Sequence, residues 1–187
     1  MRILDATASR RTPWKNGGGE TREIAIFPAD ATIDSFGWRI SMATVAIDGP
    51  FSIFPDVDRT LCILDGAGVR LQFDGEAFAV TPGCPPLTFK GERPVSASLI
   101  DGPITDFNVM TRRSTHLHHV IRLTLQAGEP HQLRGVSALF CAAGSVNISD
   151  ASVTTRIGAG STVFDPGDAA VQSDTPATLL LVTITAN

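Results

Sequence analysis

The chain has few cysteines, and their number and spacing indicate the kind of cellular compartment in which it works. Only three of its 187 residues are cysteine, namely Cys62, Cys84 and Cys141, and no two of them form a Cys-x-x-Cys pair. Cys62 and Cys141 lie inside apolar runs, where a reduced and buried thiol is the usual arrangement. An odd number of unpaired thiols fits a reducing compartment, so the sequence does not predict a disulfide framework.

Signals for export, membrane insertion and nucleic-acid binding are also missing. The first residues, Met-Arg-Ile-Leu-Asp, lack the apolar core of a signal peptide. The best apolar run, residues 177–186, is shorter than a membrane span and is interrupted by threonines. The formal net charge is -4, and no basic patch or basic run with interleaved aromatics occurs. We therefore expect a cytoplasmic protein that has neither a membrane nor a nucleic acid as its partner.

No window has a sustained 3.6-residue apolar period, so the sequence predicts little helix. Asp-Gly and Pro-Gly pairs recur at short intervals instead, and short runs rich in Val, Ile, Leu, Phe and Thr lie between them. The runs are residues 38–47, 60–64, 69–73, 95–100, 119–125, 137–141 and 178–185. Many short strands separated by such turn signals are typical of an all-β sandwich or barrel.

A weak internal repeat indicates that one β unit occurs twice. Residues 64–71 resemble residues 140–148, and residues 79–83 resemble residues 163–167. The two offsets differ by a short insertion, which loops tolerate. We predict two related halves, residues 1–113 and residues 114–187, packed as one compact unit.

Two stretches resemble the metal-binding motifs of cupin barrels but lack essential ligands. Residues 160–168 have the glycine, proline and glycine of the second cupin motif without its histidine. His116 and His118 look like the first motif, but the next acidic residue is Glu129. Two imidazoles without a carboxylate or a third histidine make a poor metal site. We predict no metal and no cofactor, and we expect these histidines on a solvated connection between the halves.

The most distinctive stretch is residues 14–24, Trp-Lys-Asn-Gly-Gly-Gly-Glu-Thr-Arg-Glu-Ile. Successive glycines weaken a strand and add no packing, so they suit a place where backbone approaches a partner closely or takes a positive φ. The donors Lys15, Asn16 and Arg22 beside them favour an anionic or carbonyl-bearing ligand. A flexible surface turn with polar neighbours explains the same residues. A P-loop is excluded, because the lysine precedes the glycines and no Gly-Lys-Ser/Thr follows.

Together with three further blocks, this stretch resembles the HutD/Ves family. The further blocks are residues 36–41 (Phe-Gly-Trp-Arg-Ile-Ser), residues 48–59 with Asp-Gly-Pro-Phe-Ser-Ile-Phe-Pro, and residues 106–113 with Asp-Phe-Asn-Val-Met. They occur in the family's order and cover essentially the first 113 residues, whereas the C-terminal part matches only in its β-rich character. Glu20 departs from the family, which often has a small or apolar residue there.

The resemblance implies a bicupin, a duplicated cupin or RmlC-like jelly-roll barrel with little helix. It also implies an association with bacterial histidine utilisation, as a regulator or small-molecule sensor. A cupin barrel without metal ligands keeps a cavity at its mouth, where small ligands bind. We therefore expect a non-enzymatic regulator that binds a small carboxylate metabolite, such as urocanate or a formyl- or formimino-glutamate. Self-association through a barrel face stays open.

Strand parity and the glycine stretch together select the ligand-binding candidates. They are Trp14, Lys15, Asn16, Gly17, Gly18, Arg22, Arg39, Arg59 and Asn108. The planar fork of an arginine holds a carboxylate through two hydrogen bonds, which suits Arg39 or Arg59. The two asparagines would orient the ligand, Lys15 adds charge, and Trp14 adds an apolar wall.

Parity assigns the faces, and a structural role competes with each assignment. Arg39 shares a strand face with Ser41 and Ala43, Arg22 with Ile24 and Ile26, and Asn108 with Asp106, Met110 and Arg112. In the structural alternative, Arg39 and Arg59 pair with Asp48, Asp56 or Asp58 and fix turns. Arg112 and Arg113 are expected on a solvated face.

No catalytic residue is predicted. The sequence has no Gly-x-Ser-x-Gly, and its histidines lie outside the family blocks. A metal-free cupin enzyme acting on a related metabolite would need a base such as Glu20 or Glu23. By parity Glu23 points away from Arg22. A protein-interaction module that regulates a partner is the third alternative, and an exposed apolar patch would favour it.

Overall fold

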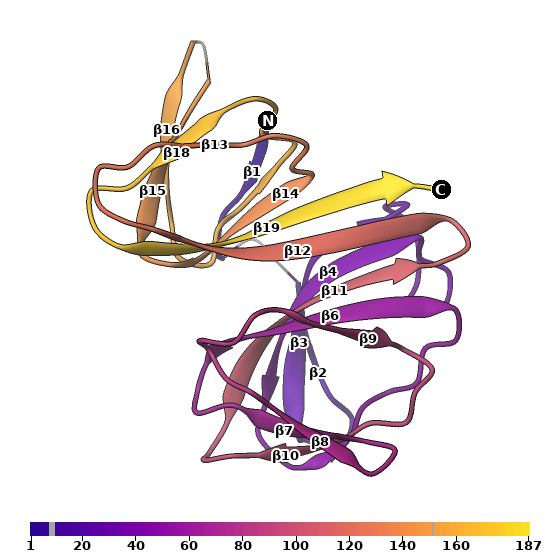
Figure 1. The fold of residues 1–187 in the computed structure, drawn as a ribbon. Coiled ribbons are helices and arrows are strands. Elements are labelled where there is room, and N and C mark those ends of the chain that lie inside the picture. The colour runs from indigo at the N-terminus through magenta and orange to yellow at the C-terminus, as the bar shows by residue number, and fades with distance from the viewer. Residues whose placement is uncertain (8–9, 151) are drawn as a thin grey trace. The chain divides into compact units, whose positions relative to one another are not determined.

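The structure is a computed structural model that describes residues 1–7, 10–150 and 152–187 (Figure 1). Within these residues it consists of β-strands, turns and bends, so the all-β prediction is confirmed. The part of the chain so described contains no helix of the length and hydrophobicity needed to cross a membrane.

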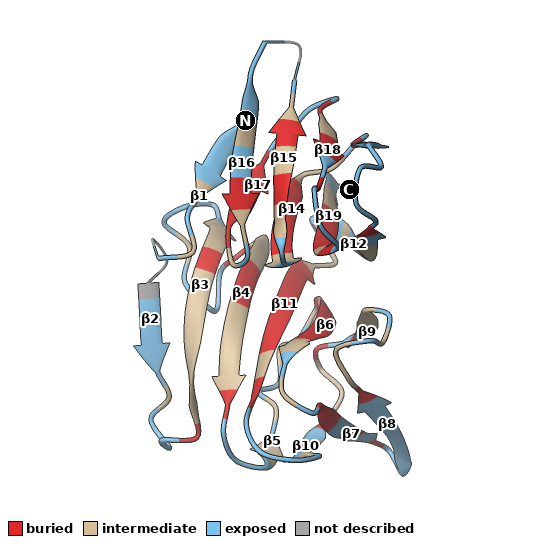
Figure 2. Cartoon of the chain, turned by 90° about the vertical axis from the view of Figure 1, so that its left-hand side faces the viewer, coloured by how far each residue is buried: buried red, intermediate tan, exposed pale blue. Residues whose placement is uncertain are grey.

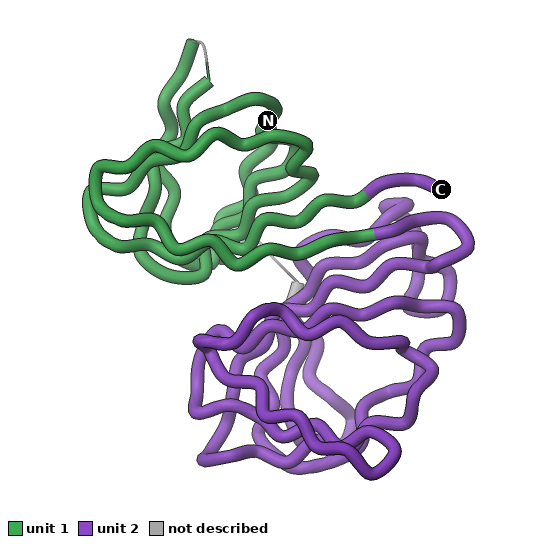
Figure 3. Tube along the Cα trace, viewed as in Figure 1, with its two compact units in different colours: residues 1–9, 118–184 green, residues 10–117, 185–187 purple. Residues whose placement is uncertain are grey.

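The chain forms two compact units, which Figure 3 colours separately. One unit consists of residues 10–117 and 185–187, and we call it the polar barrel for reasons given below. The other consists of residues 1–9 and 118–184, and we call it the apolar barrel. These bounds differ from the predicted ranges 1–113 and 114–187, because the N-terminal strand belongs to the later unit.

The polar barrel contains a six-stranded and a four-stranded sheet. The larger sheet has the order β2 (Arg10–Pro13), β3 (Gly19–Phe27), β4 (Trp38–Val45), β11 (Ile104–Arg112), β6 (Val57–Asp65) and β9 (Leu87–Lys90). The smaller sheet has the order β5 (Gly49–Pro50), β10 (Ser96–Leu99), β7 (Val69–Phe73) and β8 (Glu76–Val80). All the pairings between these strands are antiparallel.

The apolar barrel repeats this arrangement. Its first sheet has the order β1 (Arg2–Leu4), β17 (Thr162–Phe164), β14 (Ala138–Ala143), β19 (Ala177–Ala186) and β12 (His116–Leu125). Its second sheet has the order β13 (His131–Gln132), β18 (Ala170–Gln172), β15 (Ser145–Ser149) and β16 (Thr154–Gly158). The orders β4-β11-β6-β9 and β12-β19-β14-β17 correspond strand by strand, as do β5-β10-β7-β8 and β13-β18-β15-β16.

This correspondence supports one half of the sequence repeat and corrects the other. Residues 64–71 and 140–148 both span a turn from one sheet to the other, β6 to β7 and β14 to β15, and these turns are equivalent in the two barrels. Residues 79–83, however, span the end of β8, whereas residues 163–167 span the end of β17, which corresponds to β9. The second similarity therefore joins places that are not equivalent in the fold.

Period-two alternation explains why these sequences form half-buried strands. In β7 the side chains of Val69, Leu71 and Phe73 are buried, and the residues between them are exposed. Figure 2 shows the same contrast between strands, because β11 is largely buried and the described residues of β2 are exposed. His116 and His118 lie in β12, where the chain passes from one unit to the other, so the connection on which they were expected is a strand.

The two barrels differ in what fills them. The apolar barrel is filled by aliphatic side chains and one thiol, with Leu125, Leu139, Cys141, Leu179 and Leu181 from the sheet that contains β12, β14 and β19. The polar barrel has an apolar cluster too, which includes Leu61, Ile63, Leu71 and Phe89. In that barrel, polar side chains are buried beside the cluster on the inner face of the six-stranded sheet.

Candidate functional site

Three rows of side chains cross the inner face of the six-stranded sheet. They are Arg39, Met110, Arg59 and Phe89; Glu23, Ser41, Asn108 and Leu61; and Thr21, Ala43, Asp106 and Ile63. Within each row, neighbouring residues are Cα partners on adjacent strands. The rows point inward, because Leu61, Ile63 and Phe89 belong to the apolar cluster of this barrel. Charged and polar groups from four strands thus meet inside one barrel.

Arg59 is a buried cation on the inner face of β6. It is 7% exposed, and none of the described carboxylates lies within ion-pair distance of its guanidinium. One of its Nη atoms donates to the carbonyl oxygen of Ser52 at 3.2 Å, while its buried Nε has no hydrogen-bond partner. Burial lowers the pKa of Arg59 to about 10, with the nearby charge of Asp106 acting in the opposite direction. Arg59 is therefore still charged at neutral pH.

Aromatic rings surround this guanidinium. Its carbon lies 5.1 Å from the ring centroid of Phe51, 5.5 Å from that of Phe54 and 5.3 Å from that of Phe89. Such contacts stabilise a cation in part, and they leave its in-plane N–H groups available for an oxygen ligand. The rings therefore hold Arg59 in place without neutralising it.

Asp106 and Asn108 bring unpaired acceptors to the same interior. Asp106 is 3% exposed, and the backbone N–H of Ala43 donates a hydrogen bond to its carboxylate. Its Oδ1 has no partner, and neither does Oδ1 of Asn108, which is 7% exposed. Burial raises the pKa of Asp106 to about 7, although Arg59 and the Ala43 hydrogen bond both favour the ionised form. Buried polar atoms without partners are rare, so three in one interior indicate a place for a polar ligand or water.

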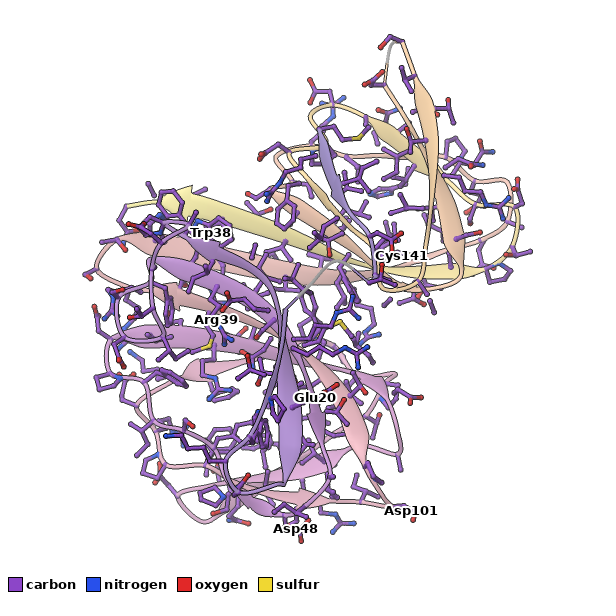
Figure 4. The ribbon with its side chains drawn as sticks, turned by 180° about the vertical axis from the view of Figure 1, so that it is seen from behind. Glu20, Trp38, Arg39, Asp48, Asp101 and Cys141 are labelled. Carbon is purple, nitrogen blue, oxygen red and sulfur yellow. The ribbon has the colours of Figure 1, made fainter. Side chains whose placement is uncertain are left out.

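Glu23 and Arg39 connect these rows to solvent. Nε of Arg39 donates to Oε2 of Glu23 at 2.9 Å, and an Nη atom of Arg39 lies 3.5 Å from the Ser41 hydroxyl. The side chain of Arg39 is 13% exposed and that of Glu23 is 36% exposed. The exposed fraction thus increases from Arg59 on β6 through Arg39 on β4 to Glu23 on β3. Arg39 is labelled in Figure 4. Polar groups of the interior approach solvent along β3.

A network around Arg113 holds the segment that covers Arg59. Arg113 donates to Asp58 at 2.8 Å and to Glu92 at 2.6 Å, and it lies 3.9 Å from Asp56. The pKa of Arg113 is raised by the hydrogen bonds to Glu92 and Asp58. These aspartates flank Val57, directly after the segment that carries Phe51, Ser52 and Phe54. Two of the predicted partners of Arg59, Asp56 and Asp58, are therefore used by a different arginine.

The glycine stretch forms the turn between β2 and β3. The N–H of Gly17 donates to the carbonyl of Trp14 at 3.0 Å, and Gly17 has a φ of +70°. Asn16 accepts a hydrogen bond from the N–H of Gly18 at 3.0 Å, and a Cβ atom on Gly19 would lie 2.1 Å from the Thr44 carbonyl oxygen. Gly17 therefore has a conformational reason and Gly19 a steric one, and Lys15 and Asn16 are exposed at the tip of the turn.

The indole of this turn reaches the polar rows. Nε1 of Trp14 donates to the Thr21 hydroxyl at 2.8 Å, and its ring packs against the apolar cluster of the barrel. Thr21 is in the row that contains Asp106. Of the turn residues, Trp14 is thus the one that connects the turn to the interior.

Arg22 lies on the other face of the sheet. It lines an open depression of about 200 Å3 together with Arg11, Glu20, Met42, Ala43, Thr44 and Thr105. An irregularity in the β3–β4 pairing between Glu23 and Ala25 shifts the alternation, so Ile26 pairs with Arg39 while Arg22 pairs with Met42. The prediction that Arg22 and Ile26 share a face was therefore wrong. Glu20, which departs from the family pattern, pairs with Arg11 at 3.2 Å beside this depression.

The structure thus brings together three of the predicted ligand-binding residues, Arg39, Arg59 and Asn108, with Trp14 nearby. Sequence reasoning missed Glu23, Ser41 and Asp106 as members of the group. A signal for Asp106 was available, since it is two residues from Asn108 and has the same parity. No group of three or more His, Cys, Asp or Glu side chains that could hold a metal ion occurs in residues 1–7, 10–150 and 152–187.

The chain resembles proteins of one family over most of its length. The family model described as HutD matches residues 6–183, which extends the resemblance well into the second barrel. Protein Ves from Cronobacter sakazakii is 37% identical over 160 residues, which are 85% of this chain and 86% of that protein. An uncharacterized 21.2 kDa protein from the hutC 3' region of Pseudomonas putida is 39% identical over 110 residues, 59% of this chain and 57% of that protein.

Solved structures agree with the sequence comparison. HutD from Pseudomonas fluorescens SBW25 superposes with a TM-score of 0.79 at 28% identity, covering 100% of this chain and 98% of that one. Oxalate decarboxylase from Lactobacillus farciminis, at 10% identity and a TM-score of 0.67, covers 98% of this chain and 88% of its own. This second likeness concerns the fold alone, and it confirms the predicted bicupin architecture. The chain belongs to the HutD family, which is associated with histidine utilisation.

Proposed function

We propose that this protein is a non-enzymatic regulator of histidine utilisation that binds a small carboxylate metabolite inside the polar barrel. The observation that carries the proposal is Arg59, a buried guanidinium with an unpaired Nε and no carboxylate within ion-pair distance among the described residues. A buried charge is costly unless it is paired, so a protein that keeps one gains by binding an anion there. The chemistry of arginine favours a carboxylate.

The remaining polar atoms of the rows favour a ligand with a second functional group. Asn108, with its unpaired oxygen, is one row from Arg59, and Asp106, with its own, is two rows from it. They suit a ligand that carries an amide, imidazole or acid group beside its carboxylate. Urocanate and N-formylglutamate combine these groups. The pair of Arg39 with Glu23 would flank such a ligand on the β3 side.

Calorimetric titration with urocanate and N-formylglutamate tests the proposal. Wild-type protein is expected to bind one of them with a Kd of about 1 μM, which corresponds to about -8 kcal/mol. Arg59→Met removes the charge while keeping an apolar stem, and it should weaken binding by at least about 30-fold, as loss of a buried charge partner costs about 2 kcal/mol or more. Arg59→Lys keeps the charge but loses the planar fork, so it should be intermediate.

Arg70→Met is the matched control, because Arg70 is exposed on β7 between two buried residues. Its affinity should equal that of the wild type. The absence of saturable heat with either acid in the wild type, or equal affinities of Arg59→Met and Arg70→Met, would count against a carboxylate site at Arg59.

A metal-free enzyme is a second candidate, and Asp106 is the observation that favours it. A buried carboxyl with a pKa of about 7 is suited to take and return a proton at neutral pH. Glu23 and Glu20 are less suited, because each is paired with an arginine. Conversion of either acid to a product, detected by NMR and abolished in Asp106→Asn, would favour the enzyme. Saturable binding with unchanged ligand would favour the regulator.

A further inference from the structure

We propose that Asp106 is a second recognition residue of the Arg59 site, and that it couples the binding of a carboxylate to the uptake of one proton. This inference rests on the proposed function, since it concerns the same interior. It goes further by assigning a role to Asp106 and by stating what else enters with the ligand. The ligand and a solvent proton would be bound together, so the site would hold the equivalent of the neutral acid.

The geometry places Asp106 where the charge of a ligand would act on it. Asp106 and Arg59 come from neighbouring strands, β11 and β6, on the same inner face. Asn108 lies between their two rows. The Asp106 carboxylate uses one side to accept the hydrogen bond from Ala43, and its Oδ1 is buried and unpaired. Oδ1 of Asp106 is thus an unpaired buried acceptor on the same inner face as Arg59 and Asn108.

Few other charges face Asp106. From β4 and β3 come Arg39 and Glu23, which neutralise each other at 2.9 Å. From β6 comes Arg59, the cation without a carboxylate partner among the described residues. The four-stranded sheet, β9 and the segments beside them contribute apolar core side chains: Val69, Leu71, Phe73, Val80, Leu87, Phe89, Val95, Ala97 and Leu99. Arg59 is therefore the main charge that favours the ionised form of Asp106.

Binding of an anion removes that influence. A carboxylate on Arg59 offsets the positive charge, adds a negative charge nearby and excludes water, and all three changes disfavour an ionised Asp106. Since burial already raises the pKa of Asp106 to about 7 against the effect of Arg59, the bound state should hold the proton well above neutral pH. Arg59 stays charged over this range, because its pKa is about 10.

The proton balance of the step is simple. Above neutral pH the free protein has an ionised Asp106, and one proton moves from water or buffer to its Oδ1 when the ligand binds. No covalent bond to the ligand forms or breaks. The new O–H group then donates a hydrogen bond to an oxygen of the ligand, so a lone acceptor becomes a satisfied donor. The affinity should consequently fall about tenfold for each pH unit above about 7.5, as linkage requires when one proton is taken up.

The number of protons taken up can be measured by calorimetry in two buffers that differ in ionisation enthalpy. The probe is N-formylglutamate at about pH 8, where both of its carboxylates are ionised. We expect close to one proton taken up per site in the wild type. Asp106→Asn keeps a buried hydrogen-bond donor of the same shape, so it should bind with no proton uptake and with an affinity independent of pH. At about pH 9 it should therefore bind at least tenfold more tightly than the wild type.

A gain of affinity distinguishes this role from mere structural damage, which would lower affinity at every pH. Asp101→Asn, in the exposed turn between β10 and β11, is the matched control and should behave as the wild type (Figure 4). Wild-type binding with no proton exchange or with proton release, or undiminished uptake in Asp106→Asn, would overturn the inference and leave the carboxylate site standing. The wild-type pH series decides the matter even if the variant does not fold. Absence of any binding to the wild type overturns the proposed function, and this inference with it.

Discussion

Asp106→Asn is expected to gain stability relative to the wild type as the pH rises from about 4 to about 7, with no ligand present. The reason is the burial of an ionisable group. In the unfolded chain Asp106 has its usual pKa of 3.8, whereas in the folded protein its pKa is about 7. The folded state thus holds the proton more tightly than the unfolded state over this range.

The sign and size of the effect follow from this difference. Below about pH 4 Asp106 is protonated in both states, so it has no effect on stability. As the pH rises, the unfolded state loses its proton first, and the free energy of unfolding falls until the folded state also ionises near pH 7. At about 1.4 kcal/mol per pKa unit, the rise from 3.8 to about 7 lowers the free energy of unfolding by about 4 kcal/mol. Asparagine does not titrate, so the variant escapes this loss.

Urea denaturation followed by tryptophan fluorescence measures the unfolding of the polar barrel, which contains Asp106. Both tryptophans, Trp14 and Trp38, lie in the polar barrel. Subtracting the wild-type curve from that of the variant cancels other carboxylates, such as Glu92, whose pKa is lowered by its hydrogen bond from Arg113. Wild type and Asp106→Asn with parallel pH profiles would refute the reasoning, since Asp106 would then be ionised in the folded protein at little cost.

Three further predictions concern residues outside the polar rows. Arg113→Met should lower the free energy of unfolding by about 2 kcal/mol, because charged hydrogen bonds are lost, and a shift of less than about 0.5 kcal/mol in urea melts would contradict this. Gly19→Ala should prevent native pairing of β3 with β4, seen by circular dichroism, whereas Gly17→Ala should cost only about 1 kcal/mol. In the native protein, one thiol of three, that of the partly exposed Cys84, should react quickly with a thiol reagent; rapid reaction of all three would contradict the burial of the others.

Much of the polar interior could be predicted from strand parity alone. Arg39, Arg59 and Asn108 point inward as expected, because β4, β6 and β11 are regular over the residues concerned. Parity fails at Arg22, because the alternation shifts between Glu23 and Ala25 and nothing in the sequence marks that place. A single irregularity of pairing thus moves a candidate residue to the other face of the sheet.

Pairings between side chains could not be predicted in the same way. That Glu23 neutralises Arg39 depends on the register between β3 and β4, and that Arg113 uses Asp56 and Asp58 depends on the path of a loop. The importance of Asp106 depends on its burial, which the sequence does not reveal for a single acidic residue. The sequence marks residues 14–24 as unusual and suggests a ligand. The close approach of β3 to β4 at Gly19 explains that glycine as well as a ligand would.

The pairing of β1 with β17 has a consequence for how the protein is made. Arg2, Ile3 and Leu4 leave the ribosome long before their partners Phe164, Val163 and Thr162. During translation the first strand must therefore wait unpaired, while β2 to β11 can already assemble. A fragment ending at residue 117 contains every described strand of the six-stranded and four-stranded sheets of the polar barrel. A fragment that lacks β1 or β19 does not contain the whole of the apolar barrel, so that barrel is completed after the polar one.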